Sequence, residues 1–211
     1  MARLQPAQRN SGTREVILEA AERLFAERGF AATSVRDIVS EAETSAPSLY
    51  HYFGSKENLV VELIADRHTA YCDELEGDLA SAKTPFEVCQ KFVKFVLTSM
   101  SKRPVTAKFL LGIMFGPQQD LPEKAVGQTL ARSPEILQTR MREVCDGVSE
   151  SRLVFARMML VGMVTPAVLM FLTSGIQSFS RKLPDCTAWR VVDMLNDSHP
   201  TCAWPDLGPR S

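Results

Sequence analysis

Apolar residues along the chain recur at the spacing of helices. From Val16 to Phe25 they follow i, i+1 and i+4 steps, the period of a helix with one buried face. The expected inward residues of this helix are Val16, Ile17, Ala20, Ala21, Leu24 and Phe25. Gly29 suits the left-handed position after a helix, which predicts a helix from Gly12 to Arg28. Alternating runs bounded by hairpin turns do not occur, so the pattern predicts an all-α protein.

A short second helix is expected after Gly29. Thr33 or Ser34 can cap it, and Asp37 lies three residues after Ser34 as the acid of a capping box. Its expected inward residues are Val35, Ile38 and Val39.

A turn at Glu43 and Thr44 precedes a third helix, which Ser45 can cap and whose first turn holds Pro47. Leu49 and Phe53, four residues apart, are expected to face the core. Two helices joined by such a turn form a helix-turn-helix, whose second helix can enter the DNA major groove. The residues left outside are Ala46, Pro47, Ser48, Tyr50 and His51. The rings among them suit phosphate contacts, but they suit helix packing as well.

A fourth helix is expected from Lys56 to about Leu79, with Ser55 as its cap after a turn at Gly54. Lys56 lies near the positive N-terminus of this helix, where anions bind readily. A solvated surface charge is the alternative for Lys56 and for Arg36.

The segments "TREVILEAAERLFAERGFAATSVRDIVSEA" and "SLYHYFGSKENLV" resemble the TetR/AcrR-type bacterial transcriptional regulators over about residues 13–65. The resemblance implies that the segment from Ser34 to Phe53 reads DNA and that Tyr50 and Lys56 contact phosphates. The residues predicted to bind DNA are Thr33, Ser34, Arg36, Ser45, Ala46, Pro47, Ser48, Tyr50, His51, Tyr52 and Lys56. Arg3, Arg9 and Arg14 are candidates for further backbone or minor-groove contacts.

This chain departs from the family pattern in the turn and the third helix. Glu43 replaces the usual glycine and Thr44 the usual valine, which we expect to strain or loosen the turn. Ala46 stands where a polar or basic residue is common, and Pro47 where glycine is common. Direct readout is therefore expected to rest on Ser48, Arg36 and apolar contact with thymine methyl groups.

The remainder of the chain is expected to form a helical body. "TPFE" at residues 84–87 starts a helix that stops before Pro104, residues 105–115 form a short apolar helix, and Asp120 with Glu123 opens a helix toward Cys145. Methionine and phenylalanine are frequent here and suit an apolar ligand, although ordinary core packing explains each of them singly. The residues predicted to bind a ligand are Met100, Phe109, Met114, Phe115, Met159, Met163 and Phe171.

Residues 151–173 are apolar nearly all round, so both faces of this helix need covering. Arg157, Gly162 and Pro166 interrupt the run, which favours a buried helix over a membrane span. A self-complementary interface with a second copy provides the cover, together with an amphipathic helix at residues 184–196, and the resemblance likewise implies a dimer. The predicted interface residues are Phe155, Met158, Val161, Trp189, Val192 and Leu195. Arg157 is either a rim charge or an interior ion-pair partner.

Composition adds few constraints. The formal net charge of the 211 residues is −1, so contact with nucleic acid must come from a local patch. The five cysteines lack a CxxC pair, which suits thiols in a reducing cytoplasm. His68 and Cys72 have metal-ligand spacing but no third ligand nearby, so packing is the favoured interpretation. A redox role for Cys89 or Cys145 lacks the basic surroundings that lower a thiol pKa.

These patterns predict a cytoplasmic, ligand-responsive, homodimeric DNA-binding protein, not an enzyme, and the resemblance implies a repressor that binds a palindromic operator and leaves it when a small apolar molecule binds; no cofactor or metal is expected. The expected domains are a DNA-binding head at 1–58, a regulatory and dimerisation body at 59–198 and a tail at 199–211. The alternatives are a small-molecule carrier or enzyme that uses the apolar body, and an activator or a corepressor-dependent regulator.

Overall fold

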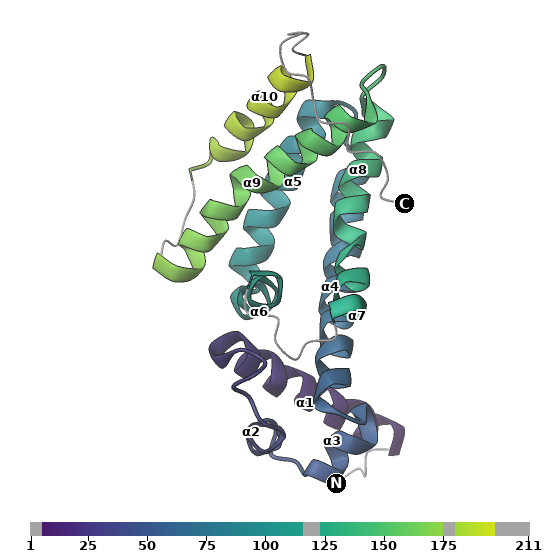
Figure 1. The fold of residues 1–211 in the computed structure, drawn as a ribbon, viewed down its shortest axis with the longest axis vertical. Helices are drawn as coiled ribbons and strands as arrows, with labels where there is room; N and C mark the ends of the chain where they lie inside the picture. Colours follow the sequence, from purple (N-terminus) through teal and green to yellow (C-terminus); the bar gives the residue numbers. More distant parts are fainter. Residues whose placement is uncertain (1–5, 116–122, 175–179, 197–211) are drawn as a thin grey trace. The chain divides into compact units, whose positions relative to one another are not determined.

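The computed structural model describes residues 6–115, 123–174 and 180–196, shown as a ribbon in Figure 1. The helices in these ranges are α1 (Pro6–Arg28), α2 (Val35–Glu41), α3 (Ala46–Phe53), α4 (Lys56–Ala80), α5 (Pro85–Lys102), α6 (Pro104–Phe115), α7 (Glu123–Leu130), α8 (Arg132–Val144), α9 (Glu150–Ser174) and α10 (Leu183–Asn196). The predicted all-α fold is confirmed.

The chain divides into two compact units. The first comprises Met1–Ala70 and Arg103–Leu130, and the second comprises Tyr71–Lys102 and Ala131–Ser211. Helix α4 belongs to both. The predicted boundary between residues 58 and 59 separates a DNA-binding head from a regulatory body, not two compact units, and it stays a prediction. The predicted tail at 199–211 lies outside the described residues.

Helix α1 begins at Pro6, earlier than predicted, and ends at Arg28 as predicted. Gly29 follows with φ 80°, and its N–H donates to the carbonyl of Phe25 at 3.0 Å. The predicted burial of Val16 is wrong, because this side chain is 44% exposed. Leu18 is fully buried instead, so the buried stripe begins one residue later than the pattern indicated.

The caps of α2 and α3 follow the predicted chemistry. The Ser34 hydroxyl accepts a hydrogen bond from the Asp37 N–H at 3.2 Å, and the Asp37 carboxylate accepts one from the Ser34 N–H at 2.9 Å. The Ser34 hydroxyl also donates to the Asp37 carboxylate at 2.6 Å, and this bond, together with the bond from the Ser34 N–H, lowers the pKa of Asp37. The Ser45 hydroxyl accepts from the Ser48 N–H at 3.3 Å. Both short helices therefore begin where their side chains satisfy free backbone donors.

A hydrophobic core holds α1, α2 and α3 against the first half of α4 and against α6 and α7. The Phe25 ring lies 5.5 Å from the Phe30 ring and 6.1 Å from that of Phe109. Leu49 and Phe53 are buried in the same core, as predicted. Helix α3 is thus fixed by its inner face.

A charged network lies beside this core, between α1, α4 and α6. Arg67 donates to Glu22 at 3.0 Å and to Glu15 at 2.9 Å, and the Thr106 hydroxyl donates to Glu22. Burial lowers the pKa of Arg67, but the hydrogen bonds and charges of Glu15 and Glu22 outweigh burial, and the pKa lies above its ordinary value. The Glu22 side chain is 10% exposed, so this carboxylate depends on its partners.

In the second unit, α5 packs against α8, α9 and α10. Thr84 caps α5 by accepting from the Glu87 N–H at 3.2 Å, and the Glu87 carboxylate accepts from the Lys83 N–H at 2.6 Å. The Gln90 amide donates to Asp185 at 2.6 Å and so ties α5 to α10. The predicted start of α5 is confirmed.

The prediction of one helix from Asp120 to Cys145 is wrong. Helix α7 ends at Leu130 and α8 begins at Arg132; Asp120 lies outside the described residues. Pro134 gives the physical reason, because within one long helix it would remove a hydrogen bond to Leu130 and clash with that carbonyl. In the observed structure Pro134 lies in the first turn of α8, where no N–H donor is needed.

Candidate nucleic-acid interface

The turn between α2 and α3 has the geometry of a helix-turn-helix. The N–H of Ala42 closes α2 on the carbonyl of Ile38 at 2.9 Å, and the N–H of Thr44 returns to the carbonyl of Val39 at 2.9 Å. Glu43, between them, has φ 47°. Among the described residues other than glycine, it is the one with a left-handed backbone. The strain expected from a glutamate at this glycine position is thus located at one residue.

Glu43→Gly is expected to stabilise the protein by roughly 0.5–1 kcal/mol, since the relief of left-handed strain exceeds the added freedom of glycine in the unfolded chain. Thermal unfolding followed by circular dichroism measures the shift. Glu43→Gln is the matched control, because it removes the charge and keeps the strained Cβ. An equal gain from the glutamine variant would show that charge, not backbone strain, limits stability at this position.

The outer face of α3 is open to solvent. Tyr50 is 51% exposed, Pro47 and His51 are exposed, and Ala46 and Ser48 are half-buried in the first turn. The Ser48 hydroxyl lies 2.9 Å from that of Ser45. Small groups near the helix start and two rings beyond them therefore form one accessible surface.

Two predicted DNA-binding residues lie inward. Thr33 is 1% exposed, and its hydroxyl donates to the carbonyl of Gly29 at 2.8 Å, so this side chain is engaged within the protein. Tyr52 is half-buried and packs against the core of the first unit. Its ring lies 5.2 Å from that of His51 in an edge-on arrangement.

The start of α2 presents two further predicted residues to solvent. Ser34 is exposed, but its hydroxyl is engaged with Asp37 in the capping box. Arg36 is exposed, and it is the single lysine or arginine among residues 33–55, which also contain Asp37, Glu41 and Glu43. The Arg23 guanidinium pairs with Glu41 at 3.2 Å. The helix-turn-helix is therefore poor in cationic side chains.

Lys56 makes contacts that its sequence position did not indicate. Its ammonium group donates to the carbonyls of Phe30 at 3.1 Å and Thr33 at 3.0 Å. It also lies 4.1 Å from the centre of the Phe30 ring. These contacts join the loop between α1 and α2 to the first residue of α4.

The arginines near the N-terminus are placed differently from one another. Arg14 pairs with Glu62 at 2.7 Å and lies 5.5 Å from the centre of the Phe53 ring. Arg9 is on α1, but its side chain is outside what the structure describes, as is all of Arg3. Their contacts with DNA stay predictions.

The residues predicted to bind an effector are distributed over both units. Phe109 is 1% exposed in the core of the first unit, Met114 on the same helix is 48% exposed, and Phe115 ends α6 outside the described side chains. In the second unit Met163 is exposed, and Met100, Met159 and Phe171 are half-buried. The effector site stays a prediction.

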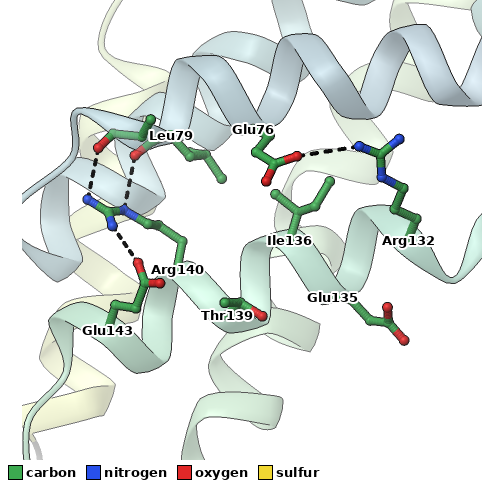
Figure 2. Close-up of a pocket in the computed structure, with 9 residues that line it drawn as sticks. Glu76, Leu79, Arg132, Glu135, Ile136, Thr139, Arg140 and Glu143 are labelled. Carbon is green, nitrogen blue, oxygen red and sulfur yellow. Dashed lines mark hydrogen bonds and ion pairs between the residues drawn. The ribbon is translucent and has the colours of Figure 1, made fainter.

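A pocket of about 330 Å³ lies in the second unit between α4 and α8 (Figure 2). Its lining residues are Glu76, Leu79, Ala80, Arg132, Glu135, Ile136, Thr139, Arg140 and Glu143. Arg140 donates to the carbonyls of Leu79 at 3.1 Å and Ala80 at 3.0 Å, and so closes the C-terminal end of α4. None of the predicted effector residues lines this pocket, whose walls combine apolar surface with the charged side chains of Glu76, Arg132, Glu135, Arg140 and Glu143.

The predicted interface residues lie mainly on the surface of the second unit. Met158, Val161 and Trp189 are 54%, 40% and 58% exposed, and Phe155 and Val192 are half-buried. Leu195 is 4% exposed and packs inside the unit. The Arg157 guanidinium donates to the Gln138 side chain at 3.1 Å.

The cysteines in the described ranges are free thiols. Burial raises the pKa of Cys89 to about 12 and also raises the pKa of Cys145, which opposes the reactivity that a redox sensor requires. His68 and Cys72 are both buried, and the described residues contain no group of three metal-binding side chains.

Known proteins resemble this chain in sequence and in fold. The sequence profile described as bacterial regulatory proteins, tetR family, matches residues 17–63. The HTH-type transcriptional repressor KstR2 of Rhodococcus jostii is 46% identical over 67 residues, which are 32% of this chain and 31% of the repressor.

Two solved structures match most of the chain. A TetR family transcription regulator from Marinobacter aquaeolei has a TM-score of 0.72 at 19% identity, over 88% of this chain and 97% of that one. The transcriptional regulator FadR from Bacillus subtilis in complex with stearoyl-CoA has a TM-score of 0.68 at 18% identity, over 86% and 97%. At these identities the likeness concerns the fold. Residues 17–63 therefore hold a helix-turn-helix that matches the TetR family of bacterial regulatory proteins, and the chain shares the fold of solved regulators of that family.

Proposed function

We propose that this protein is a homodimeric transcriptional repressor that binds a palindromic operator through α3 and works in the cytoplasm. The observation that carries the proposal is the outer face of α3, which is exposed while Leu49 and Phe53 anchor its inner face. A rigidly held helix with an accessible side after a tight turn is the element that enters a major groove. The names of the relatives, which are regulators rather than enzymes, support the same proposal.

The proposed contacts with DNA fall into two groups, contacts with phosphates and contacts with base edges. Tyr50 reaches phosphates, because an exposed phenol can donate to the backbone without sequence preference, and Arg36, exposed on α2, takes part in direct readout. Ala46, Pro47, Ser48 and His51 face the base edges. Thr33 and Tyr52 are not assigned contacts, since they pack inward.

The composition of α3 limits how bases are read. The helix contains none of the arginine, lysine, asparagine or glutamine side chains that recognise guanine or adenine through paired hydrogen bonds. Ala46 and Pro47 offer apolar surface instead, and apolar surface in the major groove favours the thymine methyl group. The half-site facing the start of α3 therefore contains thymine.

Replacing those thymines with uracil tests this readout, because the change removes one methyl group and keeps the base pair. We expect a loss of about 1 kcal/mol for each contacted position, at the low end of base discrimination. Fluorescence anisotropy with labelled duplexes measures the change. The same replacement outside the half-sites is the control, and equal affinity for all the duplexes would contradict thymine readout.

A second copy of the chain covers the apolar surface of α9 and α10. Helix α9 is long and apolar enough to cross a membrane by length and composition, and its most apolar window is only 28% buried. Met158, Val161 and Trp189 on the same unit are exposed apolar side chains. An isologous interface buries these surfaces and places two heads on one palindrome, which supports a dimer over a membrane span.

A small apolar effector that favours one of two head spacings would release the operator, as linkage requires. The methionines exposed or half-buried in the second unit, Met100, Met159 and Met163, support an apolar effector. A corepressor-dependent repressor or an activator would differ from this proposal only in the sign of the coupling between effector binding and DNA binding.

Selection of duplexes from a random library, with the purified protein at physiological salt, tests the proposed function. We expect an enriched palindrome whose half-sites lie about 34 Å, one helical turn, apart. The absence of any enriched sequence from a folded protein would favour a carrier or an enzyme that uses the helical body.

A further inference from the structure

We propose that the pocket between α4 and α8 is a binding site for a small primary ammonium ion that carries a short apolar chain. Glu76 accepts hydrogen bonds from the ammonium group, and Ile136 packs against the chain. The inference goes beyond the proposed function, because it concerns a ligand other than the apolar effector and does not depend on DNA binding.

The size and the apolar walls of the pocket limit what it can hold. Its volume of about 330 Å³ lies at the lower end of the range for ligand sites, which favours a small molecule. Leu79 and Ala80 of α4 and Ile136 of α8 provide apolar surface. Figure 2 shows the Ile136 side chain in the space between the two helices. A molecule that fits these walls has a short apolar part.

Glu76 brings to this apolar surface a carboxylate that can accept further hydrogen bonds. The Arg132 guanidinium donates to Asp73 at 2.7 Å and reaches Glu76 at the longer distance of 3.4 Å. Asp73 is thus the stronger partner of Arg132, and a carboxylate can accept about four hydrogen bonds. Figure 2 shows Glu76 extending from α4 toward Ile136 and Arg132 of α8. Glu76 is therefore placed to bind donors of a molecule that rests on Ile136.

The charges around the pocket favour a cation over an anion. Carboxylates outnumber guanidinium groups among the side chains that line it, which are those of Glu76, Glu135, Glu143, Arg132 and Arg140. Helix α4 also ends here, at Ala80, and the carbonyl end of a helix carries a partial negative charge. Both contributions stabilise a positively charged ligand.

Both arginines of the pocket are already engaged within the protein. Arg132 bridges Asp73 and Glu76, as described above. Arg140 donates to the carbonyls of Leu79 and Ala80 and also pairs with Glu143. An anionic ligand would have to displace these partners, whereas a cationic ligand uses the carboxylates and leaves the arginines in place.

The lining residues also indicate which kind of cation fits. None of them is aromatic, so the pocket lacks the cage of rings that binds a quaternary ammonium group. Carboxylate oxygens bind N–H donors through charge-assisted hydrogen bonds, and the hydroxyl of Thr139 adds an acceptor. A primary ammonium group, with its N–H donors, matches these acceptors.

Hexylamine is the probe for the test, because it is a protonated primary amine at neutral pH and has a short apolar chain. Hexanol keeps the chain without the charge, trimethylhexylammonium keeps the charge without N–H donors, and hexanoate reverses the charge. Titrations of the full-length protein, followed by ligand-observed NMR, measure the dissociation constants. Hydrogen exchange followed by mass spectrometry, with and without hexylamine, locates the site.

Glu76→Gln removes the carboxylate charge and keeps the size of the side chain. Asp78→Asn is the matched control, because Asp78 is exposed on the same helix and does not line the pocket. For the wild type we expect hexylamine to bind at least 10-fold more tightly than each of the three analogues and to slow exchange at residues 76–80 and 132–143. For Glu76→Gln we expect about 10-fold weaker binding of hexylamine, the effect of losing a charge-assisted hydrogen bond, and for Asp78→Asn unchanged binding.

Equal affinity for hexylamine and hexanol would overturn the proposal, since the apolar chain alone would then account for binding. Equal affinity for trimethylhexylammonium or hexanoate, an equal loss in the two variants, or unchanged exchange at residues 76–80 and 132–143 would overturn it as well. Each of these results would leave the proposed function standing, because the selection of duplexes tests that function separately.

Discussion

Phe109→Ala is expected to lower the free energy of unfolding by about 3–5 kcal/mol, the cost of deleting a buried ring and leaving a cavity. Phe109 is 1% exposed, and its ring stacks on that of Phe25 at 6.1 Å in the core that holds the helix-turn-helix. The sequence pattern assigned Phe109 to an effector site, whereas its surroundings are those of a core residue. The loss is therefore expected in the absence of any effector.

Met114→Ala is the matched control on the same helix, because Met114 is 48% exposed and was also predicted to bind the effector. Its substitution is expected to change stability by no more than about 0.5 kcal/mol, as for most surface positions. Urea unfolding followed by circular dichroism, at one protein concentration, compares the two variants with the wild type. Equal small effects at both positions would contradict the core role of Phe109.

Arg67→Met is expected to cost about 2–3 kcal/mol, somewhat less than the loss of one partner from a fully buried ion pair, since 19% of the Arg67 side chain is exposed. The variant leaves the Glu22 carboxylate, whose side chain is 10% exposed, with the hydrogen bond from the Thr106 hydroxyl. Methionine keeps the apolar length of the side chain, so the loss reports on charge and hydrogen bonds.

Arg23→Met provides the comparison, because the Arg23–Glu41 pair is 46% exposed on both sides. An exposed pair of this kind contributes about 0–1 kcal/mol. Urea unfolding of both variants measures the difference. A cost for Arg67→Met no larger than that for Arg23→Met would show that the network between α1, α4 and α6 adds no stability of its own.

The helices of the head were predictable because local chemistry decides them. The capping box of Ser34 and Asp37, the Ser45 cap and the glycine after α1 each satisfy a backbone requirement within a few residues, and each is present. The break between α7 and α8 was also indicated by the sequence, because Pro134 disfavours a continuous helix through its position, although α9 accommodates Pro166 in its interior. The burial of Leu18 instead of Val16 depends on packing against other helices, which periodicity locates only to within a residue.

The candidate site was predictable in its location and less so in its details. The exposed face of α3 follows from the anchors Leu49 and Phe53. The contacts of Lys56 with Phe30 and Thr33 join residues more than twenty positions apart, and no spacing rule relates them. The burial of Phe109 depends in the same way on α1, since an apolar residue on a short helix fits a core and a pocket equally well.

We propose that two copies of this chain bind one palindromic duplex through α3. Native mass spectrometry of the protein with the selected duplex, beside a duplex of the same composition in scrambled order, tests it most directly. We expect a complex of two protomers with the palindrome and at least a 1,000-fold preference over the scrambled duplex, the lower end for specific DNA binding. A single bound protomer, or equal binding of both duplexes, would contradict it.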